Sequence, residues 1–122
     1  MKKQVIALDT NQMEWIERPS EETGKSYFRK TLIEDEDTGM LIKLAYYPEG
    51  YITPWHDHPC AHGMYVLEGT LYTSDGEFGP GTFVWHPEGV VQEHGATAPG
   101  GVKVLFITNK QFGIRFVPPE ER

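Results

Sequence analysis

The sequence has one cysteine, no long apolar run and no cluster of basic residues. Cys60 has no second cysteine to pair with, so an intrachain disulfide is excluded. The first residues, Met1, Lys2 and Lys3, are not followed by the apolar stretch of a secretory signal. The apolar runs are also too short to span a bilayer. Together these absences predict a cytoplasmic protein without a membrane partner.

Basic side chains are scarce. Eleven lysines and arginines face eighteen acidic residues, which gives a formal net charge of -7 at pH 7. Binding to nucleic acid or to an anionic membrane normally needs a clustered basic surface. We therefore expect no nucleic-acid partner. The acidic surplus lies mainly at residues 34–37 and 120–121, which is typical of a solvated turn and a tail.

Sustained helical periodicity is missing as well. Short β-rich runs alternate with turn signals, in a chain that has thirteen glycines and nine prolines. The segment before about Lys25 fits an edge strand followed by a polar loop. The other expected strands are 26–33, 40–47, 51–56, 62–67, 70–73, 82–86, 89–94, 102–108 and 112–117. Because 122 residues fit one domain, we predict a single all-β barrel or sandwich.

All five histidines fall between positions 56 and 94. His56 and His58 flank Asp57, and the alternation of side chains in a strand places both imidazoles on one face. His62 follows after three residues that can turn the chain back to the same point. This cluster predicts a site for one divalent metal ion. Because imidazole binds metals in its neutral form and titrates near pH 6.5, we expect binding to weaken below about pH 6.

Other arrangements of potential ligands fit the sequence less well. A one-turn helical pair of histidines, as in zinc proteases, is disfavoured because Pro59 and Gly63 both oppose a helix. Glu68 precedes a glycine at the end of an expected strand and fits a turn. Cys60 fits a partly buried thiol. His86 fits a turn residue that forms a local hydrogen bond.

A second expected strand carries Gln92 and His94, two residues apart and therefore on one face. Imidazole is the stronger ligand for a transition metal. A two-residue step, however, moves a side chain by about 6.5 Å, more than one metal–ligand bond can absorb without a bulge. We expect His94 to complete the set begun by His56, His58 and His62, with Gln92 nearby as a hydrogen-bonding residue or a weak fourth ligand.

The surroundings of this site are expected to be apolar. Strand alternation sends Met64 and Val66 to the histidine side of one strand, and Ile52 and Pro54 to the histidine side of another. Such a pocket suits a small, partly aromatic molecule. We therefore expect the partner of this protein to be a small-molecule ligand or substrate.

Residues 50–69 resemble the first of two motifs that define the cupin superfamily. That motif is a glycine, five residues, His-x-His, three or four residues, a glutamate, six residues and a glycine. Gly50, His56, His58 and Gly69 match it. His62 stands in the place of the glutamate.

Residues 81–96 resemble the second cupin motif. Gly81, Pro87 and Gly89 match its anchors, whereas Gln92 stands where a histidine is usual and Ala96 where an asparagine is usual. The spacing is kept at every anchor, although two of the four usual ligands have changed. The resemblance implies an antiparallel jelly-roll β-barrel over residues 1–122.

The run 62–69 looks like the cupin branch that contains 2,4'-dihydroxyacetophenone dioxygenase and the acetylacetone-cleaving and ChrR-type cupins. Members of that branch also lack the glutamate. A third histidine commonly occupies the position of Gln92 in them, whereas pirin-like cupins can use the position two residues later, which is that of His94.

The resemblance implies three kinds of function. The first is an Fe(II)-dependent dioxygenase that acts on a small carbonyl or phenolic compound. The second is a non-catalytic sensor of a metal or small molecule, and the third is an isomerase or lyase that uses the metal as a Lewis acid. Imidazole ligands suit Fe, Ni, Cu or Zn. Analogy of fold further implies a homodimer.

Overall fold

The computed structural model describes residues 3–122, which form β-strands joined by turns and two short 3-10 segments. No helix in this part of the chain is long and apolar enough to cross a membrane. The elements are η1 (Thr10–Gln12), β1 (Ile16–Ser20), β2 (Lys25–Glu34), β3 (Leu41–Tyr47), β4 (Ile52–Asp57), β5 (His62–Gly69), β6 (Leu71–Thr73), β7 (Gly76–Phe78), β8 (Phe83–His86), β9 (Gln92–Gly95), β10 (Val102–Thr108), β11 (Arg115–Phe116) and η2 (Pro119–Glu121).

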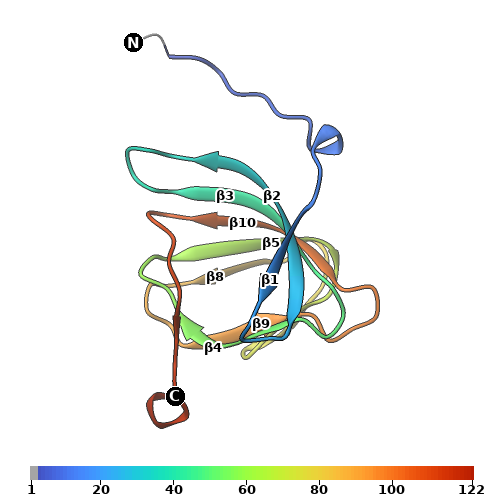
Figure 1. Cartoon of the computed structure of the whole chain (residues 1–122), viewed down its shortest axis with the longest axis vertical. Helices are drawn as coiled ribbons and strands as arrows, with labels where there is room; N and C mark the ends of the chain where they lie inside the picture. The colour runs from blue at the N-terminus through green and yellow to red at the C-terminus, as the bar shows by residue number, and fades with distance from the viewer. Residues whose placement is uncertain (1–2) are drawn as a thin grey trace.

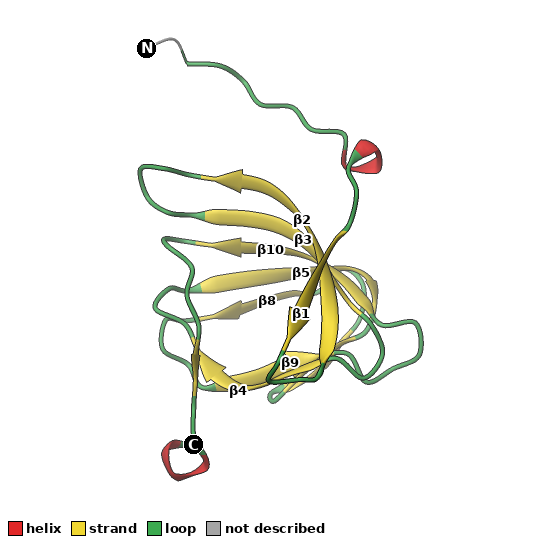
Figure 2. Ribbon diagram, in the orientation of Figure 1, coloured by secondary structure: helices red, strands yellow, loops and turns green. Residues whose placement is uncertain are grey.

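The strands form two antiparallel sheets that enclose the core (Figures 1 and 2). The larger sheet has the order β1-β2-β3-β10-β5-β8, and the smaller has the order β11-β4-β9-β6-β7. The expected all-β jelly roll is confirmed. Within residues 3–122 no strand of one sheet pairs with a strand of the other, so the expected closed barrel is corrected to two facing sheets.

Two expected strands are shorter than the sequence suggested. The segment 89–94 becomes a strand only at Gln92, because the turn around Gly89 occupies its first residues. The segment 112–117 is paired only at Arg115 and Phe116. In its first half, the carbonyl of Gly113 accepts a hydrogen bond from the His58 ring instead of from a strand. The expected edge strand before Lys25 is confirmed as β1.

The core lies between the sheets and is filled from the inward faces of β3, β5 and β10. Every second residue of β3 and β10 is buried, as expected for strands in the middle of a sheet. Met64 and Val66 point inward from β5, as the sequence predicted. The buried apolar cluster consists of Ala45, Tyr47, Tyr51, Met64, Val66, Leu71, Ala96, Val102, Val104 and Phe106.

A β-bulge in β4 changes which of its residues face inward. Thr53 pairs with His94 and His56 pairs with Gln92, so two residues of β4 between these pairs face one residue of β9. Thr53 and His56 are therefore both buried. The prediction that Ile52 and Pro54 share the inward face of His56 was wrong, since the extra residue shifts the alternation between them.

Gly95 allows β4 and β9 to approach closely enough for this pairing. A Cβ atom at Gly95 would collide with the carbonyl of Tyr51 and would lie 2.7 Å from the Cα of Ile52. We therefore expect Gly95→Ala to lower the free energy of unfolding by roughly 1–3 kcal/mol, the usual cost of overpacking. Urea denaturation with a constant m-value would measure this loss.

Gly79→Ala is the matched control for this substitution. No atom lies within 4 Å of a Cβ built at Gly79, and its φ is not positive. Its unfolding free energy should therefore change by less than about 0.5 kcal/mol. Equal effects of the two substitutions would contradict the argument from close strand approach.

Candidate metal centre

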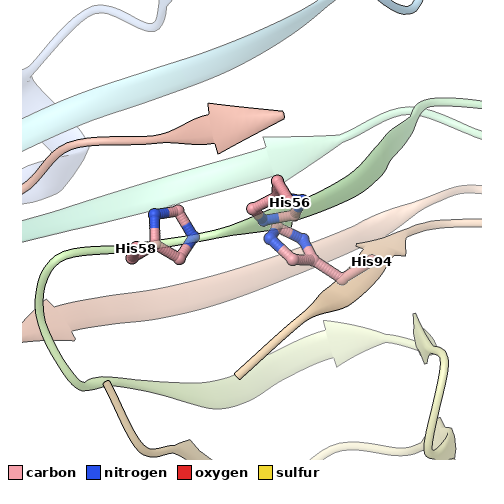
Figure 3. A group of neighbouring side chains, drawn as sticks. All are labelled: His56, His58 and His94. Atoms are coloured by element: carbon pink, nitrogen blue, oxygen red, sulfur yellow. The ribbon is translucent and has the colours of Figure 1, made fainter. Parts of the chain in front are cut away.

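Three buried histidines from two adjacent strands meet between the sheets (Figure 3). His56 belongs to β4, His58 follows the end of β4, and His94 belongs to β9. One nitrogen from each lies within 4.8 Å of the others. Nitrogens held this closely can bind one ion, because each metal–nitrogen bond to zinc, for example, spans about 2 Å. Three histidines can therefore hold a metal ion here.

Backbone carbonyls orient two of these rings. The Nδ1 atoms of His56 and His58 lie 2.6 Å from the carbonyl oxygens of Pro54 and Gly113, respectively. A carbonyl can only accept, so each Nδ1 carries the proton and donates it. Each Nε2 then has a free lone pair, and both Nε2 atoms are buried without a hydrogen-bond partner. Such carbonyl contacts commonly fix metal-binding histidines.

His94 reaches the same point because of the bulge. Its ring lies 4.9 Å from that of His56, edge to face, although His94 pairs with Thr53 rather than with His56. Its Nδ1 atom is buried and has no hydrogen-bond partner. The sequence-based objection to His94 was the 6.5 Å step along a strand. The extra residue in β4 removes that objection. Three neutral imidazoles are a set of ligands that fits a divalent transition metal.

His62 and Gln92 lie beside this group rather than within it. The His62 ring is 4.7 Å from that of His58 but 6.4 Å from that of His94. Its Nε2 atom lies 3.4 Å from the side-chain nitrogen of Gln92, so the two side chains face each other. The oxygen of Gln92 is buried without a partner. The structure thus brings all five predicted residues together, with three of them closest.

His86 differs from its sequence-based interpretation. The expected local hydrogen bond is absent: both ring nitrogens are buried without a partner among residues 3–122. The ring stacks on His62 with a centroid distance of 4.8 Å, because His62 and His86 pair directly between β5 and β8. Burial of the last residue of β8 could not be inferred from its place beside a proline.

Two other potential ligands lie away from the three histidines. Glu68 is exposed and forms an ion pair with Lys103, with 3.0 Å between the charged atoms. Cys60 is buried, and burial raises the pKa of its thiol. Neither Glu68 nor Cys60 belongs to the group of side chains that could hold a metal ion together.

Burial lowers the pKa of every histidine in the cluster. The pKa of His56 falls to about 4, mainly through desolvation and further through the nearby His58. Desolvation also lowers the pKa of His58, His62 and His86, and that of His94 falls well below 6.5. The rings are therefore neutral at lower pH than free imidazole. This moves the expected loss of metal binding below the value of about pH 6 taken from unperturbed histidine.

A pocket of about 440 Å³ opens beside His56, His58 and His94. Aromatic side chains form much of its lining, including Tyr27, Tyr47, Tyr51, Phe106, Phe112 and Phe116. It is large enough for a small organic molecule. Lys43 also lines it and was missed by sequence analysis. Strand alternation in residues 40–47 places Lys43 on the face of Ala45 and Tyr47. The opposite face carries Ile42, Leu44 and Tyr46, so the sequence alone does not indicate which face is buried.

A jelly roll with inward histidines on adjacent strands defines this protein as a cupin. Residues 3–113 match the family described as the ChrR cupin-like domain. The chain therefore belongs to this family of cupins, as the two sequence motifs suggested. No curated protein matches the sequence significantly.

Solved structures support the same fold. A proposed acetylacetone dioxygenase from Methylibium petroleiphilum PM1 is 12% identical, with a TM-score of 0.83 over 100% of this chain and 87% of that one. The polyketide cyclase RemF from Streptomyces resistomycificus is 24% identical (TM-score 0.72; 97% and 89% covered). The DMSP lyase DddQ from Ruegeria pomeroyi DSS-3 is 20% identical (TM-score 0.67; 89% and 63% covered). At these identities the likeness concerns the fold alone.

We expect the purified protein to bind about one divalent ion per chain, and replacement of His56 and His58 together by Ala to abolish binding. His94→Ala should weaken binding roughly tenfold or more, and Gln92→Ala less, because an imidazole is a better ligand than an amide. Metal content by elemental analysis and competition with a chelator would measure both effects.

Asp57→Asn provides a matched control between the two histidines, since Asp57 forms an ion pair with Arg115 on the outer side. It should keep full metal content. A double histidine variant that retained its metal would disprove the site. If only the Gln92 change weakened binding, His94 would not be a ligand.

The lowered histidine pKa values also predict how the metal-free protein responds to acid. Free histidine titrates near 6.5 and His56 in the fold near 4, so between these values the unfolded chain binds more protons. Stability should therefore be full above about pH 6.5 and fall progressively as the pH is lowered toward 4. Denaturation midpoints in chelator between pH 4.5 and 7.5 would show this. His56→Gln should flatten the slope, and a pH-independent wild type would refute the linkage.

Proposed function

We propose that this cupin is a metal-dependent, dioxygenase-like enzyme that acts on a small carbonyl or phenolic compound. The proposed metal is Fe(II), held by His56, His58 and His94. The main support for this proposal is a set of three buried imidazole nitrogens that have no hydrogen-bond partner. They lie at the wall of an aromatic pocket of about 440 Å³. A metal site without an adjacent cavity would instead suit a structural ion.

The chain's own residues would hold and orient the substrate. A divalent ion bound here would supply Lewis acidity and, as Fe(II), reactivity toward O₂. The rings of Phe106, Phe112 and Phe116 form apolar walls against which a flat substrate can pack. Burial raises the pKa of Tyr47 and Tyr51, so their hydroxyls stay protonated. Such hydroxyls can donate hydrogen bonds to a substrate oxygen.

We further propose that His62 and Gln92 act as a pair at the edge of the metal site. Their facing side chains are close enough for a weak hydrogen bond, which would limit rotation of both. His62 also packs against Phe106, with ring centroids 5.0 Å apart. In this arrangement His62 is a fourth nitrogen near the ion, and Gln92 supports it.

Two of the comparisons support this proposal. The family includes cupins of the ChrR kind, and one similar fold is that of a proposed acetylacetone dioxygenase. The cyclase and the lyase among the similar folds keep the Lewis-acid alternative open. The predictions of one cupin domain over residues 1–122, a cytoplasmic location and a homodimer stay predictions.

Oxygen uptake separates these functions. Protein loaded anaerobically with Fe(II) is mixed with a panel of β-diketones and hydroxyacetophenones in air-saturated buffer. We expect at least one compound to consume O₂ in proportion to its own disappearance. Zn(II)-loaded protein should consume none, because zinc has no accessible redox chemistry. The His56→Ala, His58→Ala double variant should also be inactive.

Each other outcome points to an alternative. Conversion of a compound by the Zn(II) form without O₂ would favour a Lewis-acid isomerase or lyase. Binding of metal and compounds without any conversion would favour a sensing cupin. Either result would overturn the proposed oxygenase.

A further inference from the structure

Lys43 lies on the inward face of β3, in the middle of the larger sheet. The whole residue is 3% exposed, and it is the only lysine, arginine, aspartate or glutamate buried within residues 3–122. Burial of a lysine is rare, because its ammonium loses most of its hydration. Lys43 pairs with Phe106 of β10 on one side and with Thr31 of β2 on the other. Its position is therefore fixed by the sheet.

Aromatic rings surround the ammonium group. The Nζ atom lies 4.8 Å from the ring centre of Phe106, 5.1 Å from that of Tyr27 and 5.2 Å from that of Phe112. Ring faces at these distances stabilise a cation. Nζ also donates a hydrogen bond of 3.2 Å to the hydroxyl of Tyr27. This bond uses one of the three ammonium donors.

No negative charge balances Lys43. Among residues 3–122 it forms no ion pair with a carboxylate, although four such pairs occur on the surface. Burial lowers its pKa below 10.5, with partial compensation from Tyr27. A buried cation of this kind is stabilised strongly by an anion placed beside it. The fold thus supplies a cationic group with free donors and no anion of its own.

Lys43 faces the same pocket as the three histidines. The single ring of Phe112 lies between Lys43 and the histidines. The centre of this ring is 5.1 Å from the centre of the His58 ring, and the ring also contacts the ammonium group of Lys43. A compact molecule in the pocket can therefore reach both groups. The acidic residues of the lining, Glu21 and Glu22, are exposed residues of the β1–β2 turn, where water screens their charge.

We propose that Lys43 anchors a carboxylate of the ligand, which narrows the substrate class to small, flat carboxylic acids. The carboxylate accepts hydrogen bonds from the free donors of Nζ, the carbon skeleton packs against Phe106 and Phe112, and a second oxygen function faces the histidines. This inference rests on the proposed function, because it assigns a ligand class to the same pocket.

Benzoate and benzamide test the anchor, because they have the same shape and differ in charge. Both are titrated by calorimetry into Zn(II)-loaded wild type and into Lys43→Met, which keeps the length and apolar body of the side chain. Wild type should bind benzoate about tenfold to a hundredfold more tightly than benzamide, as expected for a charge-assisted hydrogen bond. In Lys43→Met this preference should disappear while benzamide affinity and metal content stay unchanged.

Failure of this inference can be told apart from failure of the proposed function. The metal-free His56→Ala, His58→Ala double variant should still prefer benzoate, since its Lys43 is intact. An unchanged preference in Lys43→Met, or an equal loss of benzoate and benzamide binding, would assign Lys43 a structural role and overturn the anchor. If Lys43→Met does not fold, an NMR titration of isotope-labelled wild type tests the anchor instead. The ε-carbon resonance of Lys43 must shift on addition of benzoate and stay unchanged on addition of benzamide.

Discussion

Five buried imidazole rings lie between the two sheets, and their burial favours the uncharged form of each ring. The rings form a row in space in the order His94, His56, His58, His62 and His86, and the centres of neighbouring rings lie 4.7 to 4.9 Å apart. Protonation of more than one would place like charges side by side in a buried region. Neutral rings avoid this repulsion but leave buried nitrogens unpartnered. Such nitrogens are stabilised by an electron-pair acceptor, and a divalent metal ion is one.

The interior is divided into two chemical halves by the register of the strands. Toward Gly69 the inward faces of β5 and β10 carry Val66 and Val104, which pack as an ordinary core. Toward the other end, the same two strands carry His62 and Thr108, and β3 brings Lys43. The apolar half holds the sheets together, so the polar half can retain groups that would be costly in a core without such support.

The sequence predicted the fold class and most strands because turn residues and period-two alternation are local signals. It also pointed to the three histidines that lie closest together, since the His-x-His spacing and the cupin anchors occur within two short segments. Metal binding by these residues, by His62 or by Gln92 stays a prediction. Three features could not be predicted. The bulge in β4 depends on its partner β9, the burial of His86 depends on stacking by His62, and the pocket position of Lys43 depends on which face of β3 meets the second sheet.

The bulge has a consequence for how this segment can vary between related genes. The four residues from Thr53 to His56 match three residues of β9, and this count determines that the following side chains point inward. Loss of one codon there would turn His56 and His58 toward the solvent, even though every histidine would still be encoded. Substitution of Trp55, which is partly exposed, leaves the count intact. Selection is therefore expected to tolerate changes of residue in this segment far better than changes of length.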